Sequence, residues 1–415
     1  MNPATRAPRA AAVKRFHAGT HRIIPPEETL ERLRPLLPAM GITRIANVTG
    51  LDTLGIPVVM VCRPNSRSLS VSQGKGLDLA AAKASGIMES VELFHAERVA
   101  APLLLGGLRE LRGSRPLIDL DGLPRLSVSG FHDALQMLWC EGFDLVGGGR
   151  LWLPFELVHM NYTVPLPPGS GSFLMSSRGL ASGNHPLEAV SHGLCELVEH
   201  DAATLWRRRD EVARARTRLE LGTVDDAGCR ELLERYARAG VEVAVWESTS
   251  DIGLASFICT IDEREPDPAR PIPPMTGMGC HPAREVALMR ALTEAAQSRL
   301  TFIAGSRDDV LHGAYASGRD SDALRHWRER TRGERPTRHF HEAPTHRAET
   351  FEEDVDWELK RLVAAGLTQV VAVDLSRPEF RVAVSRVVIP GLEPLDDTPG
   401  YIPGPRVRRM RECGA

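Results

Sequence analysis

The chain has 415 residues, a formal net charge of −3, 42% hydrophobic residues and 25% charged residues. This is the composition of an ordinary soluble globular protein with a sizeable core, and the near-neutral charge gives no indication of nucleic-acid binding. Seven scattered cysteines without a CxxC pair speak against a zinc site or a disulfide frame and favour reduced thiols in the cytoplasm. Residues 1–22 lack the apolar core of a signal peptide, and no stretch reaches the roughly 20 apolar residues of a membrane span.

The first half of the chain predicts helices separated by short strands. Residues 1–25 are expected to form a loose arm, and Gly41 ends the first helix. The stretch Arg63-Pro64-Asn65-Ser66 is typical of a turn between two strands. In chain order we predict a helix at 27–39, strands at 43–49, 56–62 and 67–73, a helix at 78–96, a short helix at 131–141 and a strand at 153–160.

The second half repeats this alternation. Pro186 suits the first turn of a long helix, and Gly240 ends a later one. The basic C-terminal stretch PRVRRMREC is expected to be a solvated tail. In chain order we predict a helix at 186–208, a helix at 224–239, a hairpin from 241–248 and 253–262, a helix at 282–304, an exposed charged segment at 306–350, a helix at 351–365 and strands at 368–375 and 380–389.

The order helix–strand–strand–(strand)–helix occurs twice, near 27–96 and near 224–304. A Gly-x-Gly sequence leads into the final helix both times. This indicates an α+β protein with two related halves around a shared cleft. Short connections between the strands favour mixed or antiparallel sheets, and a doubly wound parallel fold fits poorly.

Three of the predicted helices share an unusual polar pattern. Each has polar residues at i, i+4 and i+7, which lie on one face of a helix, while its other residues are mostly apolar. A helix that is apolar almost all round is buried, so its narrow acidic stripe must meet something that neutralises it. The three triplets are Ser85/Glu89/Glu92, His192/Glu196/Glu199 and Arg290/Glu294/Gln297.

If the stripes converge, their carboxylates need cations. Oxygen ligands without cysteine favour Mg²⁺ over zinc or copper, and a Mg²⁺ site with open positions usually serves phosphates. Arg290 and Arg299 supply positive charge for a polyphosphate, while Ser85, Asn184 and Gln297 are candidate hydrogen-bonding groups. The Gly-x-Gly sequences are expected to offer backbone N–H groups to an anion. The candidate carboxylates are Glu89, Glu92, Glu188, Glu196, Glu199 and Glu294.

Less specific interpretations apply to each feature taken alone. A single polar triplet is usually a solvated helix face, although three such triplets on apolar helices favour a site. Gly74-Lys75-Gly76 is not a Walker loop and by itself is typical of a tight turn. His192 alone is typical of a satisfied helix histidine, and Arg307-Asp308-Asp309 of a local salt-bridged turn.

Three blocks of the sequence resemble the YcaO-domain family. They are SVSQGKGLDLAAAKASGIMESVELFHAE, NHPLEAVSHGLCELVEHDA and GMGCHPAREVALMRALTEAAQSRLTFIAGSRDD, in the family's order. The resemblance implies a YcaO catalytic domain at 42–393, preceded by an arm and first helix at 1–41 and followed by a Pro-containing basic tail at 394–415. It also implies binding of ATP and Mg²⁺ by side chains of three helices.

The resemblance assigns roles by position. Glu89 and Glu92 match glutamates that reach Mg²⁺ and phosphate, and Arg290 matches a phosphate ligand. Thr29 lies where a hydroxyl contacts the nucleotide. The remaining matches are Ser85, Asn184, Glu188 and Gln297 for the nucleotide and Glu196, Glu199 and Glu294 for the metal.

The sequence departs from the family pattern at two positions. Many members have arginine directly after the second glutamate of the first two motifs, where this chain has Leu93 and His200. Arg299 or Arg307 is therefore expected to take over the phosphate contacts of those arginines.

YcaO enzymes phosphorylate a backbone amide oxygen, and the nucleophile that follows decides the product. Features such as RIANVTGLDTLGIPVV and VVIPGLE look most like members that work with a TfuA protein, which are associated with thioamides. We expect thioamide formation in a ribosomally made peptide or protein, with a TfuA-like partner and a sulfur donor. Azoline formation is the alternative; Pro403-Gly404-Pro405 matches only part of the PxPxP tail of azoline-forming members. A non-catalytic peptide-binding scaffold also stays open, and a homodimer is expected by analogy.

Overall fold

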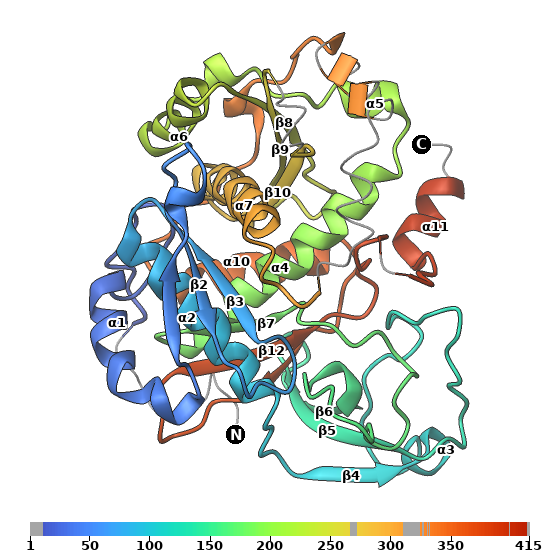
Figure 1. Cartoon of the computed structure of the whole chain (residues 1–415). Helices are drawn as coiled ribbons and strands as arrows, with labels where there is room; N and C mark the ends of the chain where they lie inside the picture. Colours follow the sequence, from blue (N-terminus) through green and yellow to red (C-terminus); the bar gives the residue numbers. More distant parts are fainter. Residues whose placement is uncertain are drawn as a thin grey trace.

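The computed structural model describes residues 11–265, 272–309, 324–325, 328–329, 331, 333–397 and 399–412. It contains three β-sheets, two of three strands and one of six, and all pairings between their strands are antiparallel. Figure 1 shows the long helices α2, α4 and α7 near the centre of the molecule. The predicted α+β class with antiparallel sheets is confirmed, and the six-stranded sheet is a third unit that the prediction of two halves did not include.

The first of the two predicted repeats forms a sheet in the order β1–β2–β3 with helices on either side in the chain. Helix α2 begins after Asp78, whose side chain accepts a hydrogen bond from Ala81 N at 2.8 Å and so caps the helix. The elements are α1 (Pro26–Leu33), β1 (Arg44–Asn47), β2 (Val58–Cys62), β3 (Val71–Lys75) and α2 (Leu79–Ala96).

The second predicted repeat has the same order of elements, and its sheet runs β10–β9–β8. Helix α7 ends at Gly305, which has a positive φ of 57° and therefore favours glycine. The elements are α6 (Ala227–Arg238), β8 (Val241–Glu247), β9 (Ala255–Glu263), β10 (Met275–His281) and α7 (Arg284–Ala304).

The six-stranded sheet supplies the third long helix. Its order is β4–β5–β11–β12–β7 with β6 on the other edge of β5, and β7 leads directly into α4. The elements are β4 (Leu103–Gly106), α3 (Leu108–Leu111), β5 (Met137–Asp144), β6 (Arg150–Pro154), β7 (Leu180–Gly183), α4 (Pro186–Arg207), α5 (Glu211–Ala215), α10 (Phe351–Ala364), β11 (Val371–Asp374), β12 (Ala383–Val388) and α11 (Pro405–Glu412).

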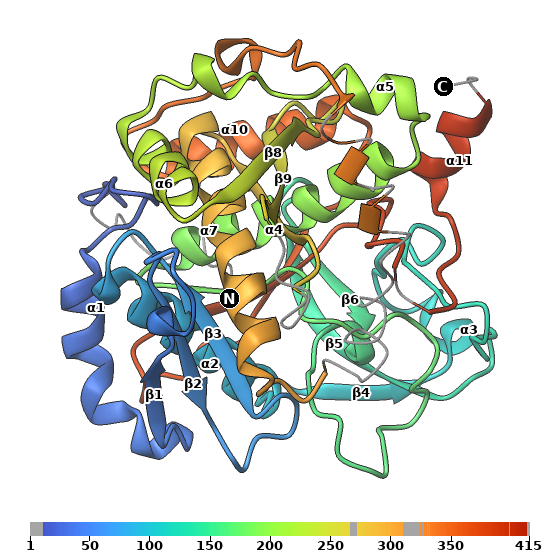
Figure 2. The ribbon, with the colours of Figure 1, turned by 45° about the horizontal axis from the view of Figure 1, so that its top comes forward.

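The three long helices contact the three sheets in a cyclic way. Each helix packs on the strand that precedes it, giving the pairs β3–α2, β7–α4 and β10–α7. In addition α2 contacts β7, α4 contacts β10 and α7 contacts β3. Figure 2 shows the helices from a second direction, with α7 crossing in front of α2 and α4. Polar residues on the inner faces of the helices are thereby directed toward a common centre.

Glycines allow the close approach of helix and strand. A Cβ at Gly74 would lie 2.1 Å from Ala82 O, and a Cβ at Gly279 would lie 2.1 Å from Ala287 O. Gly74 and Lys75 belong to β3, and Gly277-Met278-Gly279 lies inside β10, so these sequences are mostly strand and the loops expected there are wrong. The lack of a side chain at these glycines serves helix packing.

Two short elements were predicted incorrectly. The segment 131–141 was expected to be helical, but most of its apolar residues belong to β5, where buried and half-buried positions nearly alternate. A short apolar run fits both the helical period of about 3.6 residues and the strand period of about two, so it does not distinguish a helix from a strand. The strand predicted at 153–160 is instead the end of β6 followed by a 3₁₀ turn over Phe155–Leu157.

The described part of the N-terminal arm is not loose. Lys14 forms an ion pair with Asp354 of α10 at 2.5 Å, and both side chains are 1% exposed. The backbone N–H of Ile23 and the guanidinium of Arg22 contact Glu188 at 3.1 and 3.3 Å. Residues 1–10 of the predicted arm lie outside the described residues. The described portion forms part of the wall around the centre of the molecule.

The described part of the C-terminal tail is also packed. Arg406, at the start of α11, is 4% exposed and forms an ion pair with Asp201 of α4 at 2.9 Å and another with Asp251. Glu393 accepts backbone hydrogen bonds from Gly404 at 2.8 Å and from Arg406 at 3.0 Å. The predicted solvated tail is therefore wrong for Arg406 and Val407, which are buried, whereas Arg408, Arg409 and Arg411 are exposed. The guanidinium of Arg406 neutralises the buried carboxylate of Asp201.

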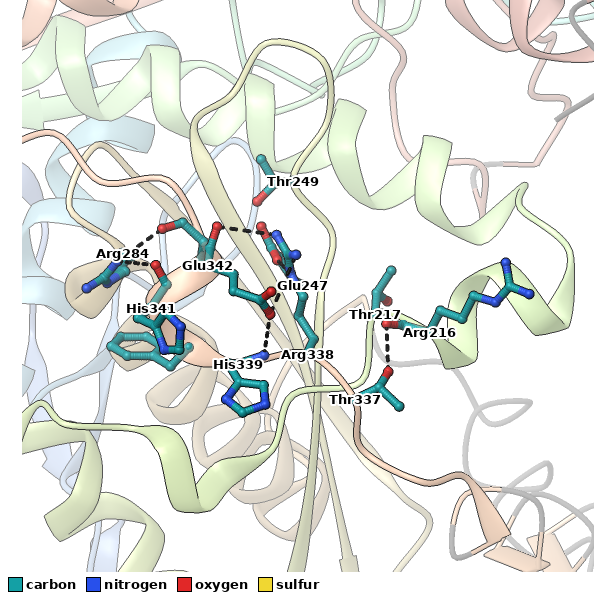
Figure 3. Close-up of polar contacts among 12 residues, drawn as sticks. Arg216, Thr217, Glu247, Thr249, Arg284, Thr337, Arg338, His339, His341 and Glu342 are labelled. Carbon is teal, nitrogen blue, oxygen red and sulfur yellow. Dashed lines mark hydrogen bonds and ion pairs between the residues drawn. The ribbon is translucent and has the colours of Figure 1, made fainter.

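The charged segment predicted to be exposed at 306–350 lies partly outside the described residues. Its last part packs against the sheet of β8 (Figure 3). Arg338 forms an ion pair with Glu247, and Arg284 donates to the carbonyl of His341 at 2.8 Å. Phe340 is 1% exposed. The described end of this segment thus packs against one side of the second repeat.

No helix in the described ranges is long and apolar enough to cross a membrane.

We predict that Gly279→Ala lowers the free energy of unfolding by about 3 kcal/mol, because the added methyl group meets the backbone of α7, which has little room to move. The control is Gly50→Ala, where nothing lies within 4 Å of the new Cβ and the expected change is within about 0.5 kcal/mol. Urea unfolding of both variants measures the difference, and equal stabilities would contradict the proposed helix–strand contact.

Candidate functional site

The three polar stripes meet in one pocket of about 900 Å³ between α2, α4 and α7. The stripes are therefore not solvated helix faces. The wall also includes side chains from β3, β10, the N-terminal arm and the segment before β7. The predicted residues that line it are Ser85, Glu89, Glu92, Glu188, Glu196, Glu199, Arg290, Glu294 and Gln297.

The middle glutamate of each stripe is fixed by a backbone N–H group from the segment that precedes its helix. Glu89 accepts from Gln73 N at 3.2 Å, and Glu294 accepts from Met278 N at 3.1 Å. Glu196 accepts from Gly179 N at 3.1 Å. In each case the backbone N–H uses one carboxylate oxygen and so orients the side chain, and in Glu294 the second oxygen pairs with Lys75.

Glu92 and Glu188 are held by the neighbouring units. Glu92 accepts from Ser182 N at 2.8 Å and from Ser182 Oγ at 2.7 Å, which connects α2 to β7. Glu188 is bound by the arm residues Arg22 and Ile23. The arm therefore contributes to the site, a role that its sequence gave no reason to expect.

Positive charge enters the pocket from several elements. Lys75, the last residue of β3, forms an ion pair with Glu294 at 2.5 Å. Arg290 lies 3.5 Å from the ring of His192, and Arg178 and Arg307 also line the pocket. A tight turn was expected at Lys75. The alternation of side chains along β3 instead places Lys75 on the same face of the strand as Gln73.

Burial raises the pKa of most of these carboxyl groups. It raises the pKa of Glu92 and of Glu199 to about 8 and that of Glu196 to about 7, from an ordinary value of 4.5. Nearby glutamates contribute in the same direction. Glu294 behaves differently: burial also favours its neutral form, but Lys75 holds its pKa below the ordinary value. The pocket therefore has unmet negative charge that a cation would stabilise.

The residues fit a hard divalent cation. Oε2 of Glu199 is buried and has no hydrogen-bond partner among the described residues, which is costly unless a ligand or ion is bound. The donors around it are carboxylate oxygens, as Mg²⁺ prefers. Within the described ranges, however, no three side chains of suitable type are already gathered at metal-binding distance. The acidic groups therefore have to move together to hold an ion.

Leu93 and His200, the two positions where the sequence was expected to depart from the family pattern, both line the pocket. Burial, followed by the charge of Arg178, lowers the pKa of His200 to about 3, so this side chain is neutral. Arg307 lies close enough for its charge to act on Glu89. Arg307, expected as a substitute for one of those arginines, lines the pocket, and so does Arg178.

Three predicted residues lie outside the lining of this pocket. Thr29 and Asn184 hydrogen-bond to each other at 3.1 Å, next to Arg32, whose guanidinium is 3.3 Å from Asn184 Oδ1. They form a separate polar cluster where α1 meets the start of α4. Arg32 was not identified from the sequence, although it lies one turn after Thr29.

Arg299 is the third of these residues. It forms ion pairs with Asp52 at 3.3 Å and with Glu263 at 2.8 Å, and it is 6% exposed. Arg299 follows Arg290 by nine residues, about two and a half turns of helix, so it faces away from the pocket. The expectation that it contacts phosphate needs correction. Its charge stabilises the contact between α7 and the surrounding sheets.

A protein-family model described as "YcaO cyclodehydratase, ATP- and Mg²⁺-binding" matches residues 73–393. The chain is 39% identical over 392 residues to an "uncharacterized protein in tfuA 3'region" of Rhizobium leguminosarum bv. trifolii, with 92% of each chain covered. It is 33% identical over 395 residues to an uncharacterized protein of Methanothermobacter thermautotrophicus, covering 92% of this chain and 97% of the relative.

Two solved structures share the fold at 22% identity. One is a heterocyclase in complex with substrate and cofactor, with a TM-score of 0.74; the match covers 94% of this chain and 54% of the heterocyclase, so the chain spans about half its length. The other is YcaO from Methanopyrus kandleri bound with AMPPCP and Mg²⁺, with a TM-score of 0.71 and coverage of 92% and 95%.

We predict that the protein without metal loses stability as the pH rises from about 5 to about 8. The pKa values of Glu92, Glu196 and Glu199 are raised on folding, so their neutral forms favour the fold below pH 4.5 and this contribution is lost as the pH passes about 7 and 8. Added Mg²⁺ should raise the thermal midpoint by several degrees at the higher pH and by less at the lower pH. Thermal unfolding with EDTA or Mg²⁺ measures both effects.

The double variant Glu92→Gln/Glu199→Gln is the control for this titration. It keeps the shape of the neutral carboxyl groups, so its thermal midpoint should vary less with pH and respond less to Mg²⁺. A wild-type midpoint that responds equally to Mg²⁺ at both pH values would contradict the assignment.

Proposed function

The chain belongs to the YcaO family of ATP- and Mg²⁺-binding, peptide-modifying enzymes, and from this premise we propose that it phosphorylates a backbone amide in a ribosomally made peptide or protein. We propose further that the amide becomes a thioamide, with the help of a TfuA-like partner and a sulfur donor. The observation that carries the proposal is the meeting of three acidic helix faces with Arg290 and Lys75 in one pocket.

The residues of the pocket suit the transfer of a phosphoryl group. Glu89, Glu92, Glu196, Glu199 and Glu294 would hold Mg²⁺, because they are the carboxylates of the stripes and, among the described residues, only Glu294 has an ion-pair partner, Lys75. ATP supplies the phosphoryl group, which makes the amide oxygen a leaving group. Such a transfer depends on positioning and on neutralising charge.

The cations have separate places around these acids. Arg290 projects from the same face of α7 as Glu294, while Lys75 approaches Glu294 from β3. Both would balance phosphate charge, and Arg178 and Arg307 would do the same from the loops. Ser85 and Gln297 are the neutral donors on the stripes. Thr29, Asn184 and Arg32 would form an outer part of the nucleotide site, because Asn184 is four residues from Glu188.

Support for a thioamide comes from the relative in the tfuA 3' region, which is similar over nearly the whole chain. A second support is the C-terminus. Pro405–Glu412 form α11, and Glu393 and Asp201 hold the start of this segment by hydrogen bonds and an ion pair. No described residue after Phe351 lines the pocket. The chain therefore differs from azoline-forming relatives, whose Pro-rich tail reaches the site.

Azoline formation is the second candidate, because the matching family model is described as a cyclodehydratase and one structural neighbour is a heterocyclase. In that reaction a Cys, Ser or Thr side chain of the peptide replaces external sulfide as the nucleophile. A third candidate, a scaffold that binds peptide without catalysis, has less support, because a scaffold has no need for a cluster of buried carboxylates that destabilise it.

We predict that Arg290→Gln weakens binding of Mg²⁺-ATP at least tenfold, because a charge-assisted contact to phosphate is worth about 1.5–3 kcal/mol. Arg299→Gln on the opposite face of α7 is the matched control. It should lower the thermal midpoint, since Asp52 is left buried without its partner, but leave the affinity unchanged. Isothermal titration of both variants tests this, and equal affinities for wild type and Arg290→Gln would remove Arg290 from the site.

We predict a gain in peptide mass that corresponds to exchange of oxygen for sulfur. The experiment combines the protein with a candidate peptide, ATP, Mg²⁺, sulfide and a TfuA-like protein, and follows the peptide by mass spectrometry. Loss of water would instead identify azoline formation. Glu89→Gln should abolish either product, while Glu234→Gln on the exposed face of α6 should not. Unchanged peptide with every partner, together with normal ATP binding, would favour the scaffold.

A further inference from the structure

The pocket is longer than the group of acids that the proposed chemistry uses. Its wall follows β3 and α7, which lie beside each other (Figure 2) and run in opposite directions. Lys75 pairs with Glu294, while Gln73, earlier in β3, contacts Thr301, two turns farther along α7. Two turns of helix span about 11 Å. The pocket therefore continues past the acids toward the C-terminal end of α7.

The N-terminal arm lies at the opposite end of the pocket. A Cβ at Gly19 would lie 3.0 Å from the sulfur of Met289, which is near the start of α7. The arm also binds Glu188, and Asn184 of the outer polar cluster is close to it in sequence. Both residues are proposed for the nucleotide. The end near Thr301 is thus left for the second substrate.

The end near Thr301 is lined mainly by uncharged side chains. The charged residues there, Arg307 and Asp309, pair with each other, with Arg307 Nε donating to Asp309 Oδ1 at 2.8 Å. Such a surface suits an uncharged ligand, because a charged one would lose its hydration without gaining partners. The uncharged lining residues are Leu69, Met160, Tyr162, Met275, Thr301 and Phe302.

Gln73 carries an unused hydrogen-bond donor at this end of the pocket. Its side-chain oxygen accepts hydrogen bonds from Thr301 Oγ1 at 2.5 Å and from Gln297 Nε2 at 3.4 Å, which fixes the amide group. Gln73 is 2% exposed and lines the pocket, yet its Nε2 has no hydrogen-bond partner among the described residues. A buried donor without a partner costs free energy, so the group indicates that a ligand supplies an acceptor.

An exposed apolar segment continues this end of the pocket onto the surface. The backbone N–H of Tyr162 donates to the carbonyl of Arg67 at 2.9 Å, which places the segment beside Leu69 of the pocket wall. Tyr162 lines the pocket and is itself 42% exposed. The apolar residues that follow, Val164 and Leu166, are 85% and 44% exposed. Apolar side chains gathered at the opening of a pocket are typical of a binding surface.

We propose that this end is the peptide subsite of the pocket. It takes an uncharged stretch of the substrate peptide, with one backbone carbonyl accepting a hydrogen bond from Gln73 Nε2. Apolar side chains of the same stretch lie against Tyr162, Val164 and Leu166. This inference rests on the proposed function, which makes a peptide the second substrate, and it adds the kind of peptide segment that the site selects.

A peptide carbonyl fits Gln73 better than a phosphate does. Lys75 and Arg290 already supply charge for phosphate, whereas a neutral amide donor matches a neutral carbonyl. The backbone N–H of Gln73 binds Glu89 at 3.2 Å, so one residue would hold both the peptide and an acid of the metal site. The amide next to the bound carbonyl would therefore lie close to the phosphoryl group that it receives.

The test uses the full-length protein with Mg²⁺ and AMPPCP, together with a library of random hexapeptides that have blocked ends. Peptides that stay bound are identified and counted by mass spectrometry. Wild type should retain mainly peptides without charged residues. Gln73→Met, which has a similar volume but no donor, should retain about fivefold less peptide, while its affinity for Mg²⁺-AMPPCP, measured by isothermal titration, stays unchanged.

The double variant Val164→Ser/Leu166→Ser tests the surface without risk to the fold, because both side chains are exposed. It should also retain several-fold less peptide. Val212→Ser is the matched control, since Val212 is 61% exposed on α5, does not line the pocket and should retain as much as wild type. Equal retention by the double variant and wild type overturns the inference, as does a wild type that retains no peptide or shows no preference against charge.

Two further outcomes separate this inference from its alternatives. If Gln73→Met loses affinity for Mg²⁺-AMPPCP but retains peptide like wild type, its donor serves phosphate and the inference is wrong. If peptides are retained as expected but no peptide changes mass in the assay with ATP and partner, the proposed function fails and the peptide subsite stands. Product formed by a protein whose peptide retention does not depend on these residues would contradict the subsite alone.

Discussion

The structure depends on a backbone-to-carboxylate contact that is repeated three times. A central helix lies directly against the segment before it, and a backbone N–H of that segment binds the middle glutamate of the helix stripe. In the two sequence repeats the spacing is the same: Gln73 is sixteen residues before Glu89, and Met278 is sixteen residues before Glu294. Glycine beside each of these donors allows the short separation. Without the contact between the backbone N–H and the carboxylate, the three glutamates would not be fixed in position around one centre.

The same geometry brings an electrostatic cost. Acidic side chains are packed into an apolar interior, and burial raises the pKa of most of them, which means that their charged forms are unfavourable until cations are present. Lys75 and Arg290 meet part of this need inside the protein. The remainder is left for a bound metal. The buried carboxylates therefore serve binding at a cost in the stability of the protein without a bound cation.

The two ends of the chain support the central helices. Lys14 joins the arm to α10, while Arg406 joins α11 to Asp201, two residues beyond Glu199 on α4. Each is a buried ion pair, so loss of one partner would leave an uncompensated charge. These contacts join α10 and α4 to the two ends of the chain. The termini therefore contribute to the precision of the pocket even where they do not line it.

The sequence by itself determined the features that follow from local periodicity. The stripes at i, i+4 and i+7 gave the inward faces of α2, α4 and α7, and the repeated order of elements gave the two related sheets. The prediction that Arg299 contacts phosphate was wrong because it relied on the charge of Arg299 alone. The spacing of nine residues from Arg290 places Arg299 on the opposite face of the helix. Weak local signals explain the other errors: the apolar run in β5 fits both periods, and the sheet of β4–β5–β11–β12–β7 joins strands from distant parts of the chain.

Only the tertiary structure decided which distant groups meet. The ion pair of Lys75 with Glu294, the contact of the arm with Glu188 and the ion pair of Arg406 with Asp201 all join residues that are far apart in sequence. The physical reason is that helical and strand periods fix the direction of a side chain relative to its own element. Its partner is fixed by how the elements pack, which is a property of the whole chain.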